Sequence, residues 1–305
     1  MDFLSLILMV SGLCLFEIIS SIDNAIINAE VLRTMSKKAR GWFLFWGLLI
    51  AVFVIRGFLP WIIVWAINPA LGAIGAFTAT FSSDPSIKES VERSAPILLA
   101  GGGIFLVFLF LHWLFLEEKN FGLPRTEKFF LKQGVWFYAV VSIILAFFSW
   151  HALAIDKMMA FGGIIGSTAF FITHGFKQNA EEGEKKLISG NLSDLSKIFY
   201  LEIIDATFSI DGVLGAFAFT MSIPIILLGN GIGALVVRQL TIKGIDKIKD
   251  YLYLKNGAMY SILCLGTIMI LEAFHFGIPD WVSPISTFSI VGFFFVKSVK
   301  CKVAH

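Results

Sequence analysis

The chain has 305 residues, of which 57% are hydrophobic and only 15% are charged. Soluble domains are roughly 45–50% apolar and about 25% charged, so this composition excludes a water-soluble protein. The net charge of +2 gives no basic excess for a nucleic-acid partner. We therefore expect an integral membrane protein whose partners are the lipid bilayer and small ions, with no nucleic acid and no organic cofactor.

Apolar runs near the ~20 residues that a membrane-spanning helix needs recur along the whole chain. They predict an all-α, polytopic membrane protein with about nine transmembrane helices, at 3–31, 41–66, 95–116, 134–151, 158–174, 198–221, 223–240, 257–274 and 283–299. The glycine-rich stretch 68–81 is too short to span and is interpreted as re-entrant or interfacial. The segment 180–194 carries both charge signs and is interpreted as a solvated linker.

Lysine and arginine gather in alternate connections of this scheme, at 33–40, 119–132, 177–197, 243–255 and 297–302. Because basic residues stay on the cytoplasmic side, we expect a multi-pass protein of the inner or plasma membrane. Its N-terminus would lie outside and its C-terminus in the cytoplasm. The scheme places Lys177 and Lys255 in cytoplasmic loops. Four histidines fall at the ends of spans, where we expect them to be interfacial: His112, His151, His174 and His275.

Two apolar runs contain similar polar segments, FEIISSIDN at 16–24 and LEIIDATFSID at 201–211. Their shared Ser-Ile-Asp aligns Glu17 with Asp205, Ser21 with Ser209, and Asp23 with Asp211. The two runs cross in opposite directions, which predicts an inverted repeat of spans 1–3 against spans 6–8. The expected organisation is one transmembrane domain, 1–305, built from a first repeat (1–116), added spans and linker (117–197), a second repeat (198–274), and a last span with tail (275–305).

Five acids lie at membrane depth in this scheme, against the two arginines Arg56 and Arg238. An ionised side chain there costs at least ~2.5–3.5 kcal/mol, so the excess negative charge needs a cation or protons. Carboxylate, amide and hydroxyl oxygens suit Mn²⁺, Ca²⁺ or Mg²⁺ rather than Cu⁺ or Zn²⁺. The sequence predicts a metal site of Glu17, Asp23, Asn24, Glu202, Asp205 and Asp211, with Ser21 and Ser209 in support and Arg56 and Arg238 gating the site or balancing its charge.

Helical spacing also constrains the backbone at these segments. At about 100° per residue, Glu17, Ser21, Asn24 and Asn28 share one face, and Asp23 lies about 120° from Glu17. Both acids of each segment can reach one site only if the helix deforms at Ser-Ile-Asp. We therefore expect a break in both helices.

Several separated motifs together resemble the TerC family of integral membrane proteins, over about residues 12–272. They are FEIISSIDN, FVIRG, GGGIFLVF, LEIIDATFSID, LGNGIGALVVRQ and YLYLKNG. The resemblance implies a transporter linked to metal-ion homeostasis, with manganese export as the favoured activity. The chain departs from the family pattern in two places. After Asp211 it has Gly212-Val-Leu-Gly, where the family often has Ser-Ile-Pro-Ala. Spans 4 and 5 are peculiar to this chain.

The resulting prediction is a divalent-cation exporter, with Mn²⁺ favoured and Ca²⁺ possible, exchanging the ion for protons, and not an enzyme. Two alternatives stay open. The first is a non-transporting membrane scaffold or assembly factor, in which the acids are structural. The second is an intramembrane aspartyl hydrolase in which Asp23 and Asp211 share a proton, which requires the two carboxyl groups to be in contact.

Overall fold

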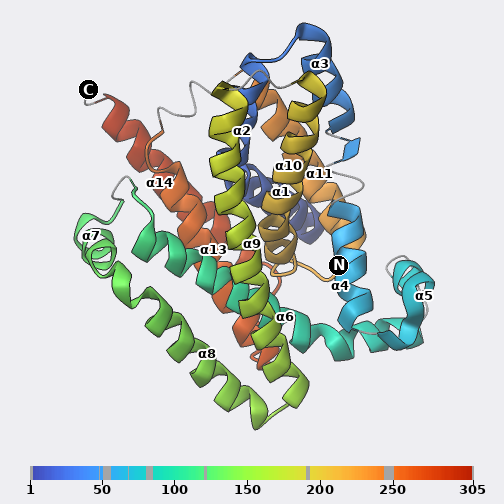
Figure 1. Cartoon of the computed structure of the whole chain (residues 1–305). Helices are drawn as coiled ribbons and strands as arrows, with labels where there is room; N and C mark the ends of the chain where they lie inside the picture. The colour runs from blue at the N-terminus through green and yellow to red at the C-terminus, as the bar shows by residue number, and fades with distance from the viewer. Residues whose placement is uncertain are drawn as a thin grey trace.

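A computed structural model of the chain describes residues 3–47, 49–50, 56–67, 69–79, 85–119, 122–189, 193–243 and 251–303. Every element within these ranges is helical, which confirms the all-α prediction. Figure 1 shows the helices gathered in one bundle, with α9 and α10 running beside each other across its front. The chain is a polytopic α-helical membrane protein.

Within the described residues, seven helical stretches are long and apolar enough to cross a membrane: Phe3–Ser20, Ser94–Leu116, Gly134–Leu153, Lys157–Asn179, Ile223–Ile242, Leu254–Ala273 and Val282–Cys301. Two of the predicted runs are not among them. The run 198–221 forms α10 (Asp194–Ala216), which is rich in charged residues. The run 41–66 contains α3 (Lys37–Trp42), the π-helical turn η1 (Phe43–Gly47) and α4 (Arg56–Ile67), and residues 51–55 between them lie outside the described ranges.

The predicted helix break at Ser-Ile-Asp occurs in one of the two segments. Helix α1 (Phe3–Ser20) ends before Ser21, whose φ of −94° and ψ of 4° leave the helical region, and α2 (Ile22–Arg33) follows. The matching segment around Ser209 lies within the continuous helix α10, so the second predicted break is wrong. In α10 the hydroxyl of Ser209 donates to the carbonyl of Asp205 at 2.6 Å, one turn back, which is compatible with an unbroken helix.

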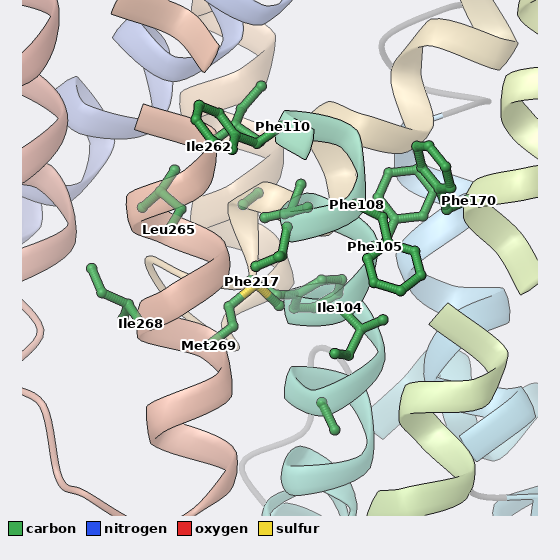
Figure 2. Packing of buried hydrophobic residues seen from close by; sticks show 14 of the residues in the cluster. Ile104, Phe105, Phe108, Phe110, Phe170, Phe217, Ile262, Leu265, Ile268 and Met269 are labelled. Atoms are coloured by element: carbon green, nitrogen blue, oxygen red, sulfur yellow. The ribbon is translucent and has the colours of Figure 1, made fainter. Parts of the chain in front are cut away.

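The core of the bundle is α6 (Pro85–Leu116), which packs between α13 (Leu254–Ala273) and α9 (Lys157–Ser189). Figure 2 shows Phe105 and Phe108 of α6 directed towards Phe170 of α9, with Leu265 and Met269 of α13 on the opposite side. All five side chains are almost fully buried. Because lipid is as apolar as these residues, close packing rather than water exclusion holds the three helices together.

Small residues allow the helix backbones in this layer to touch. Gly166 lies on the carbonyl of Gly101, and Gly162, one turn earlier on α9, lies over the carbonyl of Ile97. This small-residue spacing is typical of contacts between membrane helices. On the other side of α6, Gly103 and Gly266 face each other. A Cβ added at either glycine would lie 2.9–3.1 Å from the carbonyl oxygen of the other.

We expect Gly166→Ala to destabilise the bundle by about 1–3 kcal/mol, because the added methyl group collides with backbone at a helix crossing. The matched control is Gly175→Ala on the same helix, where an added Cβ meets nothing within 4 Å. Thermal unfolding in detergent should show a lower midpoint for the first variant only. Equal midpoints would contradict the crossing.

The other helices surround this layer. Helix α8 (Phe137–Leu153) packs on α9, while α11 (Ile223–Lys243) and α14 (Val282–Val303) pack on α1. The fully buried Glu127 of α7 (Pro124–Lys132) ties the preceding loop to α13, since it accepts hydrogen bonds from the backbone of Gly122 and from Asn256 and Tyr260. Both carboxylate oxygens accept hydrogen bonds from groups of the protein, which is the pattern of a structural carboxylate.

Two segments outside the bundle core, 68–81 and 180–194, were expected not to form spanning helices. Of the stretch 68–81, the described residues 69–79 form the short turn η3 (Pro69–Leu71) and helix α5 (Gly72–Ala79), which lies at the edge of the bundle beside α4 in Figure 1. The predicted linker 180–194 is helical up to Ser189, because α9 continues for 33 residues. The interpretation of this segment as a linker is therefore wrong for its backbone as far as Ser189.

Candidate functional site

Glu17 lies where α1 crosses two other helices. Its side chain is 1% exposed, and Oε1 accepts the hydroxyl of Ser21 at 2.7 Å. The space for the side chain comes from glycines, because Gly233 of α11 faces its Cβ and Gly212 of α10 faces its Oε2. Glu17 and Ser21 are four residues apart and share a helix face, as the sequence predicted.

Asp205 of α10 is held by two asparagines of α2. Its Oδ1 accepts hydrogen bonds from the amide of Asn24 and from that of Asn28, the latter at 3.1 Å. All three side chains are at most 6% exposed. Asn24 and Asn28 are one turn apart and follow the break at Ser21, so the break sets the direction in which α2 presents them to α10.

Glu202 lies one turn before Asp205 on α10, against the π-helical turn η1. Its Oε1 approaches the backbone of Gly47 so closely that a Cβ there would collide with it. A guanidinium nitrogen of Arg238 lies 3.1 Å from the same Cβ position. Arg238 is 6% exposed, donates to the carbonyl of Phe43 at 3.1 Å and stacks over the Phe43 ring at 4.4 Å. Arg238 thus binds a main-chain carbonyl of the π-helical turn, and such turns are frequent at functional sites.

The buried oxygens in this region exceed their donors. Oδ1 of Asn24, Oδ1 of Asn28 and both carboxylate oxygens of Glu202 are buried and accept no hydrogen bond within the described part of the chain. The side-chain amide of Asn230 on α11, which is only 1% exposed, likewise makes no hydrogen bond within these residues. Buried polar atoms are rarely left unbonded, since each costs about 1–3 kcal/mol. We call the set Asn24, Asn28, Glu202 and Asp205 the α2–α10 oxygen cluster.

Asp23 is turned away from this cluster. Its Oδ2 pairs with Nζ of Lys255 on α13 at 3.0 Å, and the same ammonium pairs with Oε2 of Glu117 at 2.8 Å. All three side chains are partly exposed, between 35% and 45%. The prediction that Lys255 lies in a loop is wrong, because Lys255 belongs to the first turn of α13 and pairs with Asp23 of α2.

Asp211 also has a lysine partner, and this ion pair is less exposed to solvent. Its Oδ2 accepts a short hydrogen bond from Lys177 of α9, and the two side chains are only 11% and 13% exposed. Lys177 therefore belongs to a spanning helix and not to a loop, which corrects the second lysine placement. Sequence reasoning missed both lysines because each lies near the end of an apolar run, where a long side chain can reach inward or outward.

The structure thus divides the six predicted metal ligands. It joins Asn24 with Asp205 and places Glu202 one turn from Asp205, while Asp23 and Asp211 each pair with a different lysine and Glu17 lies against α11. Nowhere in the described ranges do three His, Cys, Asp or Glu side chains form a group able to hold a metal ion. The side chain of Arg56 lies outside the described residues, although α4 begins there.

Spanning helices and buried acids with basic partners define a polytopic membrane protein with a charged interior. A protein-family model described as "Protein of unknown function (DUF475)" matches residues 22–304. The chain belongs to this family. Neither the curated proteins nor the solved structures contain a match to the chain.

Proposed function

We propose that this protein transports a hard divalent cation, Mn²⁺ first among them, through the α2–α10 oxygen cluster. The supporting observation is the set of buried oxygens on Asn24, Asn28 and Glu202 that accept no hydrogen bond within the described residues. With Asp205 they provide carboxylate and amide oxygens, the ligands that Mn²⁺, Mg²⁺ and Ca²⁺ prefer.

The asparagines supply a switch between an empty and a loaded site. An amide offers N–H donors on one side and an acceptor oxygen on the other. In the conformation described, Asn24 and Asn28 donate to Asp205 and so hold its charge. A half-turn of each amide would direct its oxygen to a cation next to Asp205, and the cation would then replace the two donors.

The remaining predicted residues are assigned to charge balance along the path. Asp23 and Asp211 are neutralised by Lys255 and Lys177 in this conformation. Arg238 stays charged at every physiological pH and lies beside Glu202, so it competes with a cation for that carboxylate. Arg56 would hold the equivalent place in the first repeat.

The proposal includes the TerC-like architecture of about nine spans, with the N-terminus outside and spans 1–3 repeated in inverted form by spans 6–8. It is supported by the mutual contact of Gly103 and Gly266, because helices related by a local two-fold axis make reciprocal contacts where they cross it. It is also supported by the partners of Asp23 and Asp211, since each of the two aspartates pairs with a lysine of another helix.

Two alternatives make different demands on these residues. A hydrolase would bring Asp23 and Asp211 together, whereas different lysines hold them here. A scaffold would use the asparagines only to fasten α2 to α10. Purified protein in liposomes that contain a metal-quenched dye tests transport against the scaffold: we expect Mn²⁺ to enter faster than in protein-free vesicles. Flux no higher than in those vesicles would contradict the transport proposal and favour the scaffold.

A further inference from the structure

His112 of α6 and His174 of α9 meet inside the bundle. From their positions at the ends of predicted spans, both histidines were expected to lie at the membrane interface. Their ring centroids are 3.9 Å apart, and His112 is only 7% exposed. Aromatic rings enclose the pair, since Phe137 of α8 meets His112 edge-on at 5.6 Å and Phe170 stacks on His174 at 5.9 Å. Two titratable side chains therefore lie in contact among aromatic rings.

A carboxylate faces the pair from one side. Nδ1 of His112 lies 3.4 Å from Oε1 of Glu117. Burial raises the pKa of Glu117, but the hydrogen bond from His112 and the charge of Lys255 outweigh it and hold the pKa at about 2. Glu117 is therefore negative across the physiological range and can stabilise a proton on the adjacent ring.

Charged groups of other helices surround the pair. Lys177 lies one turn after His174 on α9 and pairs with Asp211 of α10. Lys255 of α13 joins Glu117 to Asp23 of α2. Lys119, which follows α6, binds main-chain carbonyls at the end of that helix, and Glu127 of α7 bonds to α13. Glu117 is thus the one acid within the described ranges that is paired with a ring of this pair.

We propose that His112 and His174 form a proton-binding site that holds a single proton, on one ring or the other. Two imidazolium rings with centroids 3.9 Å apart would repel each other strongly, so binding of a second proton is disfavoured. Histidine is the side chain that changes charge near neutral pH, and Glu117 supplies the countercharge for the first proton.

The position of the pair gives the proton a place in transport, and this step rests on the proposed function. The pair lies between a partly exposed ion-pair group, Asp23, Lys255 and Glu117, at 35–45% exposure, and the buried pair of Lys177 and Asp211, at 11–13%. A proton entering at the exposed end can bind to the rings, where the charge of Glu117 stabilises it. Its charge on His174 then repels Lys177, the partner of Asp211. The site is therefore where the coupling proton of the transporter would bind.

Nitrogen NMR of the full chain in lipid nanodiscs, with labelled histidine, tests the proton site without any transport. We expect the signals of His112 and His174 to change together with pH and to report the uptake of one proton in total by the pair. Glu117→Gln should move the uptake to lower pH. In His174→Gln, the response of His112 should become that of a single ring.

Two results would overturn the proton site: independent titration of both rings, or no proton uptake by either ring down to about pH 4. A second measurement separates this inference from the proposed function. In liposomes, His174→Gln should flatten the pH dependence of Mn²⁺ flux. If the parent protein moved no Mn²⁺ while the coupled titration persisted, the transport proposal would fail and the proton site would stand. If Mn²⁺ flux depended on pH in the same way in the parent protein and in His174→Gln, the proposed coupling role of the histidine pair would be wrong.

Discussion

Asp205→Asn should lower Mn²⁺ flux at least about 10–100-fold, because altering even a residue that only supports a metal ligand typically costs this much. The substitution removes the charge of the carboxylate but keeps an oxygen that can accept hydrogen bonds from Asn24 and Asn28. The contact between α2 and α10 should survive, so the loss would report on charge and not on packing. Initial rates of Mn²⁺ entry into liposomes measure the effect.

The matched control is Asp280→Asn, the same change at an exposed position in the connection before α14. Its flux should equal that of the parent protein. Glu202→Gln should resemble Asp205→Asn, because Glu202 supplies the other carboxylate of the α2–α10 oxygen cluster. Parent-like flux in Asp205→Asn, with normal insertion and unfolding temperature, would remove the cluster from the transport path.

Lys177→Met should destabilise the protein by about 3–5 kcal/mol, because it leaves the carboxylate of Asp211 buried without its ammonium partner. Part of this cost can be relieved if Asp211 takes up a proton, so the loss should be largest at alkaline pH. The double variant Lys177→Met/Asp211→Asn should recover much of the stability. Unfolding in detergent, followed by tryptophan fluorescence, gives the free-energy differences.

Lys255→Met is the comparison for this cycle, since it makes the same change in an ion pair that is 39–45% exposed. Exposed pairs contribute only about 0–1 kcal/mol, so its effect should be small. A Lys177→Met variant no less stable than Lys255→Met would contradict the view that Lys177 neutralises a buried acid. A double variant as unstable as Lys177→Met alone would show that the lysine acts through other contacts.

Much of the fold could be predicted from local sequence properties. Apolar composition indicated a membrane protein, and the four-residue spacing of Glu17, Ser21, Asn24 and Asn28 indicated one polar helix face. The break at Ser21 was predicted because Asp23 lies off this face, and α1 does end there. The same argument failed at Ser209, because Asp211 finds its partner on α9 without any change in α10.

The partners of the buried acids could not be predicted, because they come from helices far away in the sequence. Lys177 and Lys255 were counted as loop residues from the clustering of basic residues, which describes average placement and not the direction of an individual side chain. The meeting of His112 and His174 likewise depends on how closely α6 and α9 approach. That approach is set by Gly101 and Gly166, whose pairing no periodicity within one helix reveals.

The position of a bound cation tests the central claim most directly. Crystals of the protein soaked in Mn²⁺, measured at the manganese absorption edge, should give an anomalous peak between α2 and α10, in contact with oxygens of Asp205, Glu202, Asn24 and Asn28. The peak should vanish in Asp205→Asn and persist in Asp280→Asn. A peak at Asp23 or Asp211 instead, or no peak at a Mn²⁺ concentration that saturates flux, would contradict the account.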